Sequence, residues 1–426
     1  MKEGAVGALG LAFTLLAAAP AAAERPRLSA RLDMAAEGEV VVLLEVEDRT
    51  PPDAHFTVTA ATLQVDGKPD QEILLLPGSG RDRYEGLVGP LPAGRHVIEA
   101  RPSGLWADDP RLAWRRLAVR AVAPGDPDHD VLRLSPRFWL RADTVGEATD
   151  VPLLAYVEED ATAGARRLSY SVVFSNEDGG TPSRALLARW GRTTDIELAY
   201  EAVVGPEGAL LAEEFQGPDH EIRPFKGRRQ GGHPVLLVAT LNNVFLDRGR
   251  SGALVSPVPV RARLDTATRE SVMDAHPWTY RVMAKELERE GKIAPGRGVK
   301  RDQVVDDPRR YLYAEARLRL EGAAAAARLS LADGSGGASH GGDSRLTIAR
   351  DGWVRTAVPL GATGSPIASL AWECLRRNDP PDQARCEIEA VRAFRLDDAY
   401  RPGPNLVEPA RLRLLGGEAG SLELVP

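Results

Sequence analysis

Apolar and polar residues alternate over many short segments of the sequence, and this two-residue period limits what the chain can fold into. Between Tyr311 and Leu320, every second residue is Leu or Ala, while the residues between them are Tyr, Glu or Arg. Successive side chains of a β-strand point to opposite faces of a sheet, so this pattern indicates a strand with one buried face. Similar runs, bounded by Gly and Pro, recur along the chain. We therefore predict a mainly β protein.

The first 23 residues have the features of a secretory signal peptide. Lys2 is followed by an apolar stretch over residues 5–19, and then by Pro20 and three alanines that end at Ala23. The apolar stretch is shorter than the ~20 residues that a membrane-spanning helix needs. We expect cleavage after residue 23, with an uncleaved N-terminal anchor as the alternative. The mature protein is expected to be secreted or periplasmic, with no transmembrane segment.

Residues 24–122 contain roughly seven short strand patterns, the number typical of one β-sandwich. Asp66-Gly67 predicts a tight hairpin turn, because both residues tolerate positive φ. The segment from Tyr84-Glu85-Gly86-Leu87 to Leu91-Pro92-Ala93-Gly94-Arg95-His96-Val97 resembles the closing strands of bacterial immunoglobulin-like modules. The resemblance implies an immunoglobulin-like fold and no particular activity.

Segments rich in Pro and Gly divide the rest of the sequence. We expect linkers at residues 123–130 and 293–307, because Pro and Gly interrupt both helices and strands. The fold class is then three consecutive β-rich, sandwich-like domains, with one amphipathic helix between the second and third. The expected parts are a signal peptide (1–23), an immunoglobulin-like β-sandwich (24–122), a central β-rich domain (131–264), a helix and linker (265–306) and a C-terminal β-sandwich (307–426).

The helix is expected over residues 275–290. Asp274 would be its N-cap, Pro277 falls in the first turn and Gly291 follows the last turn. Two other segments are less regular. Residues 184–190 fit either a short helix or a strand, and residues 334–343 contain so much Gly that we expect no order there without a partner.

Cys374 and Cys386 are the two cysteines of the chain. In an exported protein, a pair so close in sequence predicts a disulfide. A metal site built on two cysteines would need His ligands nearby, and no His follows Ser344. We therefore expect the pair to be bridged.

The charge of the chain excludes one class of partner. The formal net charge is −7 at pH 7, so we expect no nucleic-acid binding, which requires a basic face. Asp126, Asp128 and Asp130 imitate the start of a calcium-binding loop, but the Gly and the Glu that such a loop needs at its sixth and twelfth positions are absent. We interpret these three residues as a solvated acidic hinge.

Residues 168–246 hold the densest group of polar residues suited to a site. Asp195 and Glu197 are two residues apart in a strand pattern, so they share a face, where two carboxylates repel each other or attract a cation. His220 and His233 flank a loop rich in Gly and Arg, and His with carboxylate oxygens suits zinc or a similar divalent ion. The catalytic candidates are Asp195, Glu197 and His220, and the metal-ligand candidates are these three with His233.

A simpler interpretation assigns no site to these residues. Asp195 and Glu197 would then face solvent and pair with Arg189 or Arg192, and His220 would be an exposed loop residue.

Three polar segments of the central domain are expected to converge. They are the turn at 176–181, the strand start at 192–197 and the loop at 219–233, and we expect them to form the principal pocket. Asn242-Asn243 would bind a sugar hydroxyl or, more commonly, satisfy buried backbone groups.

The sequence contains no HExxH, GxSxG or Walker signature. Our first hypothesis is therefore an exported bacterial binding or scaffold protein, with a carbohydrate or another cell-envelope protein as its partner. The alternative is a secreted hydrolase that uses a divalent metal ion or paired carboxylates in the central domain. A high content of Arg, Ala, Gly and Pro suggests a GC-rich bacterial genome.

Overall fold

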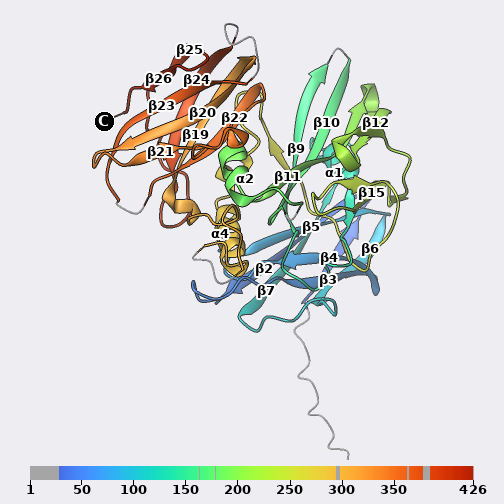
Figure 1. Ribbon diagram of the computed structural model, residues 1–426. Coiled ribbons are helices and arrows are strands. Elements are labelled where there is room, and N and C mark those ends of the chain that lie inside the picture. The colour runs from blue at the N-terminus through green and yellow to red at the C-terminus, as the bar shows by residue number, and fades with distance from the viewer. Residues whose placement is uncertain are drawn as a thin grey trace, which may run out of the picture.

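The computed structural model describes residues 28–162, 164–177, 179–293, 298–361, 364–377 and 384–425. The expected signal peptide, Asp178 of the predicted turn and part of the linker expected at 293–307 lie outside these residues. Strands dominate and form several sheets, which confirms the prediction of a mainly β protein (Figure 1). Within the described ranges, no helix combines the length and apolar character needed to span a membrane.

Residues 28–122 form seven strands that contribute to two sheets. Val40, Val42 and Leu44 are completely buried, as their run of apolar residues requires. Asp66 and Gly67 have φ values of 50° and 78°, so the predicted turn is present. One sheet contains β1 (Leu28–Met34), β6 (Gly94–Pro102), β3 (Thr59–Val65) and β4 (Lys68–Leu75), and the other contains β5 (Arg83–Leu91), β2 (Gly38–Asp48) and β7 (Leu112–Val122).

The first of these sheets continues into the central part of the chain. Val255 pairs with Glu72 of β4, and one buried apolar cluster includes both Val40 and Phe174. The division expected at residues 123–130 is therefore not a break between sheets, because short strands from beyond it extend the edge at β4. These strands are β17 (Leu254–Val255), β8 (Arg137–Trp139), β15 (His233–Val238), β14 (Arg229–Gln230) and β16 (Phe245–Leu246).

A separate six-stranded sheet carries most of the candidate site residues. Tyr156, Tyr170 and Tyr200 from its three longest strands are buried in the same apolar cluster. The strand order is β13 (Ile222–Pro224), β12 (Leu210–Gln216), β11 (Asp195–Val204), β10 (Ala165–Phe174), β9 (Pro152–Thr162) and β18 (Val260–Ala262).

Helices are few and short. Residues 184–190, which fitted a helix or a strand, are helical. The single helix expected at 275–290 is instead two, with Asp274 inside the first and not at an N-cap. The break falls at His276 (φ −128°, ψ 67°), because a residue before proline is disfavoured in the helical region. The described helices are α1 (His129–Arg133), α2 (Ser183–Trp190), α3 (Ser271–Ala275) and α4 (Trp278–Arg289), with 3₁₀ turns η1 (Pro206–Gly208), η2 (Pro218–His220), η3 (Pro308–Arg310) and η4 (Ser344–Leu346).

The C-terminal part is formed by two sheets around their own apolar cluster. Cys374 and Cys386 form the predicted disulfide, with Cα atoms 5.8 Å apart, and the bridge joins strands of the two sheets. One sheet has the order β22 (Gly352–Pro359), β19 (Tyr311–Glu321), β24 (Arg385–Arg395), β25 (Arg411–Leu415), and the other has β21 (Gly336–Ala338), β20 (Ala323–Leu331), β23 (Ile367–Arg376), β26 (Ala419–Leu422).

The Gly-rich segment at 334–343 is ordered, contrary to expectation. Its strand β21 pairs with β20, so the chain itself supplies the missing partner. Gly336 has a φ of 143°, and a Cβ there would lie 2.4 Å from the Leu329 carbonyl oxygen. Only glycine fits this close approach, and the glycines here serve strand pairing.

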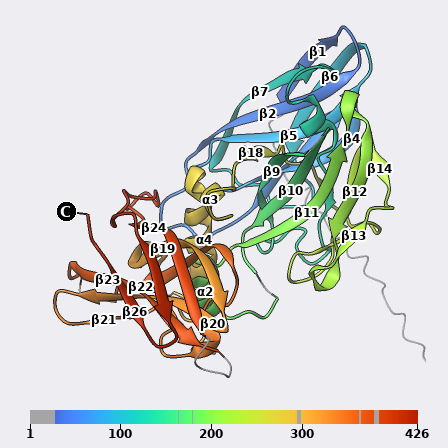
Figure 2. The same cartoon turned by 90° about the horizontal axis from the view of Figure 1, so that it is seen from above.

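Helices α2 and α4 lie between the C-terminal sandwich and the remainder of the chain (Figures 1 and 2). We call this boundary between the C-terminal sandwich and the remainder of the chain the seam, and strand β19 contacts both sides of it. Leu312 and Ala314 belong to the C-terminal core, whereas Tyr311 and Tyr313 belong to the large cluster shared by the rest of the protein. The predicted alternation is thus correct, but both faces of this end of the strand are buried.

Candidate functional site

Asp195 begins strand β11 and is almost completely buried. Its Oδ1 accepts a hydrogen bond from the Ile196 backbone N–H at 2.9 Å, and its Oδ2 accepts one from the Asn243 amide at 3.0 Å. Arg192 lies 3.8 Å away. Burial raises the pKa of Asp195, while Arg192 and the Asn243 amide oppose that rise. Both carboxylate oxygens are therefore engaged by donors of the protein itself.

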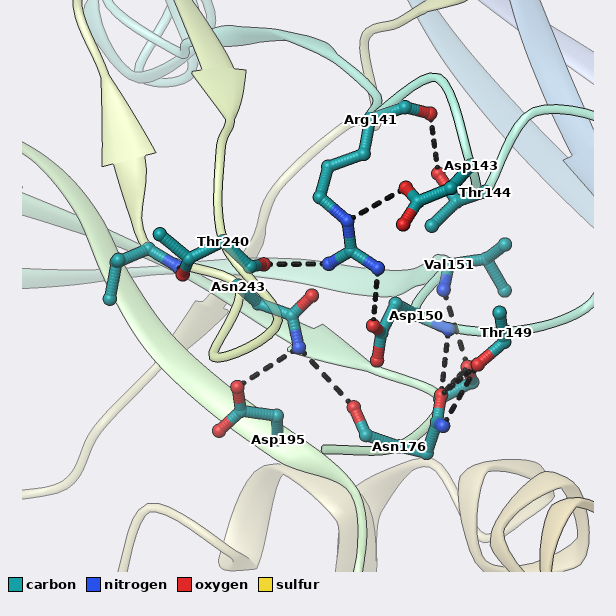
Figure 3. Close-up of polar contacts among 12 residues, drawn as sticks. Arg141, Asp143, Thr144, Thr149, Asp150, Val151, Asn176, Asp195, Thr240 and Asn243 are labelled. Atoms are coloured by element: carbon teal, nitrogen blue, oxygen red, sulfur yellow. Dashed lines mark hydrogen bonds and ion pairs between the residues drawn. The ribbon is translucent and has the colours of Figure 1, made fainter. Parts of the chain in front are cut away.

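Asn243 connects Asp195 to a longer chain of polar contacts (Figure 3). Its amide also donates to the backbone carbonyl of Asn176 at 3.3 Å, and the Asn176 side-chain oxygen accepts from the Asp150 N–H at 2.7 Å. Arg141 donates to Asp150 Oδ2 at 2.7 Å and to the Thr240 carbonyl. These contacts fasten the loops before β9, after β10 and after β15 to one another. Asn243 thus takes the more common of its two expected roles and satisfies a buried carbonyl group.

Glu197 lies on the same strand, two residues beyond Asp195. Its carboxylate accepts a hydrogen bond from the Gln216 amide, and the Nδ1 of His220 is 3.4 Å away. Its side chain is 13% exposed, whereas that of His220 is 52% exposed. Burial, together with repulsion from Asp195, raises the pKa of Glu197 to about 8. Glu197 is therefore largely a neutral carboxylic acid at pH 7.

A third carboxylate joins this group from the turn after β10. Burial and the nearby Asp195 raise the pKa of Glu177 as well. Arg269 approaches from the other side and donates to the backbone carbonyl of Ile196 at 3.2 Å. Asp195, Glu197 and Glu177 therefore lie close together, as the sequence predicted for Asp195 and Glu197. They are buried or half-buried and not fully exposed to solvent.

His233 does not join the other candidates. It is fully buried on β15, where its Nδ1 lies 3.0 Å from the Ser135 carbonyl oxygen and its Nε2 lies 3.2 Å from a Glu39 carboxylate oxygen. It therefore connects β15 to residues 28–122, which we call the first unit, and lies away from Glu197 and His220. Between His220 and His233 the chain leaves the six-stranded sheet and joins the sheet that contains β8. The spacing of the two histidines in the sequence did not predict this change of sheet.

A metal centre finds no support in the described part of the chain, which contains no group of three or more His, Cys, Asp or Glu residues suited to hold an ion. The acidic hinge behaves as a set of ion pairs. Asp128 contacts Arg261 at 3.0 Å, and Asp130 contacts Arg133 and Arg166 at 3.1 Å and 2.5 Å. Arginines, and not solvent alone, neutralise these carboxylates.

The expected pocket is present only in part. The turn at 176–181 and the strand start at 192–197 do meet, through Asn176, Asn243 and Asp195. Asn176, Glu177 and Thr193 of these two segments line a narrow cavity, but Asp195, Glu197 and His220 line neither this cavity nor four others in the described part of the chain. The simpler interpretation was right that Arg192 accompanies Asp195 but wrong about exposure, since both are buried.

A buried charge network that sequence reasoning missed continues from Arg192 into the seam. Arg192 donates to Glu270 at 3.1 Å. The fully buried Arg355 of β22 contacts Asp274 at 2.7 Å and Glu315 at 2.5 Å. Burial alone would raise the pKa of Glu270, but Arg192 and Arg355 outweigh this, and the pKa is lowered.

One feature of the sequence pointed to this seam. Glu315 follows Tyr311 and Tyr313 on one face of the alternating strand, and two aromatic residues ahead of it indicate that this face is covered at that end. Nothing local pairs Glu315 with Arg355, which lies forty positions later, so the ion pair required the fold.

Comparisons with known proteins assign no relative to the chain. No protein-family model matches it, and no curated protein matches it either.

Proposed function

We propose that the protein is an exported bacterial binding or scaffold protein, and not a hydrolase. The observation that carries this proposal is the closure of the candidate site: Asp195 Oδ2 is held by Asn243, Oδ1 is held by the Ile196 N–H, and Glu197 is held by Gln216. A catalytic carboxylate must reach a substrate or a water molecule, so carboxylates occupied by internal donors are better suited to fixing loops.

The hydrolase alternative retains one favourable observation. Glu197, with its pKa raised to about 8, is a carboxyl group protonated at neutral pH, and the exposed His220 lies beside it. Such a group would serve as a general acid if a substrate reached it. Glu197→Gln and His220→Ala would then abolish hydrolysis.

Several finer points belong to the same proposal. We assign an immunoglobulin-like fold to residues 28–122, a secreted or periplasmic location to the mature chain and a carbohydrate or cell-envelope protein as its partner. Loops and grooves held by β-sheets are common binding sites, and the short strands that join the first unit to the central part provide such a rigid support.

Metal analysis of the purified protein separates the two functions. We expect substoichiometric metal and no change in Tm when EDTA is added. The metal-dependent form of the alternative requires one divalent ion per chain, lost in Asp195→Asn but retained in Asp247→Asn, a matched change of an acidic residue elsewhere in the central part. Its carboxylate-based form requires no metal and is tested by hydrolysis assays of Glu197→Gln. Stoichiometric metal with that pattern, or hydrolysis that Glu197→Gln abolishes, would overturn the binding or scaffold proposal.

A further inference from the structure

A polar groove lies where the first unit and the central part share a sheet. Its volume is about 420 Å³, within the range of roughly 300–1,000 Å³ typical of small-ligand sites. Strand β4 forms one wall, β8 and β15 form the floor, and the segments at 228–230 and 247–252 form the opposite rim. Strands β4 and β14 lie on the same side of the molecule in Figure 2. None of the candidate site residues lines this groove.

Arginines dominate the rim of the groove. Arg229 is paired with Glu213, but Arg228, Arg248 and Arg250 are exposed and form no ion pair with any residue that the structure describes. The Arg250 guanidinium lies 5.1 Å from the ring centroid of the half-buried Trp139. Three cationic groups without acidic partners therefore gather at one place in a chain of net charge −7.

The acidic residues that the structure describes in the groove form no ion pair with these three arginines and are fewer than the arginines that line it. Asp70 pairs with the buried Arg137 at 3.1 Å. Glu72 accepts a hydrogen bond from Thr62 at 2.8 Å. Asp247 accepts the Lys226 backbone N–H at 3.1 Å. Within the described structure, only Asp70 has a cationic partner of its own, so three arginines without ion pairs share the groove with two carboxyl groups, and the arginines are in excess.

The loop that carries two of the arginines is held in place. Gly249, between Arg248 and Arg250, has a φ of 106°, and a Cβ there would lie 2.6 Å from Leu237 Cδ2. Glycine lets this loop lie against Leu237 of β15.

From this geometry we infer that the groove binds an acidic polysaccharide through its carboxylate groups, an inference that rests on the proposed binding function. Guanidinium groups form paired hydrogen bonds with carboxylates. The amide of Gln230 on the rim suits sugar hydroxyl groups. The basic area is confined to one groove, whereas nucleic acid requires an extended basic face.

The test is native affinity electrophoresis of the full-length mature chain in gels that contain polygalacturonate, neutral dextran or poly-L-glutamate. We expect polygalacturonate to retard the protein in a salt-dependent manner and dextran to leave it unaffected. The double variant Arg248→Gln/Arg250→Gln should bind at least about tenfold more weakly, because it loses two charged hydrogen-bonding groups. Arg250→Lys, which keeps the charge but loses the planar fork, should fall between the two.

The matched control is Arg31→Gln/Arg120→Gln, which removes two exposed arginines from β1 and β7, and its binding should equal that of the unmodified protein. Thermal melting would verify that every variant is folded. Absence of retardation by polygalacturonate, or equal losses in both double variants, would overturn the inference. Poly-L-glutamate bound as tightly as polygalacturonate would contradict the sugar assignment, and full affinity of Arg250→Lys would contradict the role of its guanidinium. These failures would leave the expected outcomes of the metal and hydrolysis tests unchanged, so they are distinguishable from failure of the proposed function.

Discussion

The start of β11 and the groove beside Trp139 are both rich in charged residues, but the two regions differ in how far these residues are exposed and paired. Asp195 is buried and held by Asn243, and Glu197 is largely buried and held by Gln216. Arg248 and Arg250 are exposed and have no acidic partner among the described residues. The first region uses polar groups to fasten loops, and the second presents them to solvent. A dense polar sequence is therefore a weaker sign of a binding site than a charge that the fold leaves unpaired.

The largest effect on stability is expected at Arg355, whose charged side chain is completely buried. Replacing Arg355 by Ala would leave Asp274 and Glu315 with only the partly exposed Arg392, which is 3.4 Å from each, and breaking a buried ion pair typically costs about 3–5 kcal/mol. We expect urea unfolding to show a loss of free energy in that range. Arg317→Ala, on the exposed part of β19, is the control and should change the unfolding free energy by about 0.5 kcal/mol or less. A small loss in Arg355→Ala would show that the seam does not depend on its charges.

A smaller, pH-dependent effect is expected at Glu197. Its pKa is raised in the folded protein to about 8, so folding favours its protonated form. The associated stability is present below the unfolded pKa of about 4.3 and is lost as the pH rises through about 8. Glu197→Gln should lie within about 1 kcal/mol of the unmodified protein near pH 5 and should exceed its unfolding free energy by a larger margin at pH 9, because the unmodified carboxyl group must then ionise inside the fold.

The control for this pH dependence is Glu214→Gln on the exposed side of β12, which should behave like the unmodified protein at both pH values. If Glu197→Gln gave the same difference at pH 5 and pH 9, the carboxyl group would not be the closed, protonated group described above.

The smallest effect on stability is expected in the groove. Arg248→Gln/Arg250→Gln removes exposed side chains that hold no ion pair in the described fold, so its Tm should stay close to that of the unmodified protein; exposed substitutions usually change stability by about 0.5 kcal/mol or less. Differential scanning calorimetry would measure it. A large loss would mean that these arginines support the fold, and the contrast between the two regions would disappear.

The sequence predicted what depends on local patterns. The alternation at Tyr311–Leu320, the turn at Asp66-Gly67 and the disulfide of Cys374 with Cys386 are all present. The alternation depends on a side-chain period, the turn on a backbone preference, and the disulfide on two cysteines close in sequence. Each of these can be recognised from residues that are near one another in the chain.

The sequence did not predict contacts between distant segments. His233 lies among Ser135 and Glu39, which are far from it in the chain, and the sheet continues from β4 to β17 across the expected linker. The groove was missed for the same reason, because its arginines become a cluster only when β14 and the 247–252 segment lie opposite β4. Strand pairing over such separations is set by the whole fold and not by local propensity.

The most direct test of this contrast is to titrate polygalacturonate, by isothermal calorimetry, into two double variants side by side: Glu197→Gln/His220→Ala at the closed cluster and Arg248→Gln/Arg250→Gln at the open groove. We predict that the cluster variant binds with the affinity of the unmodified protein, while the groove variant binds at least about tenfold more weakly. Loss of binding in the cluster variant, with full binding in the groove variant, would contradict the account.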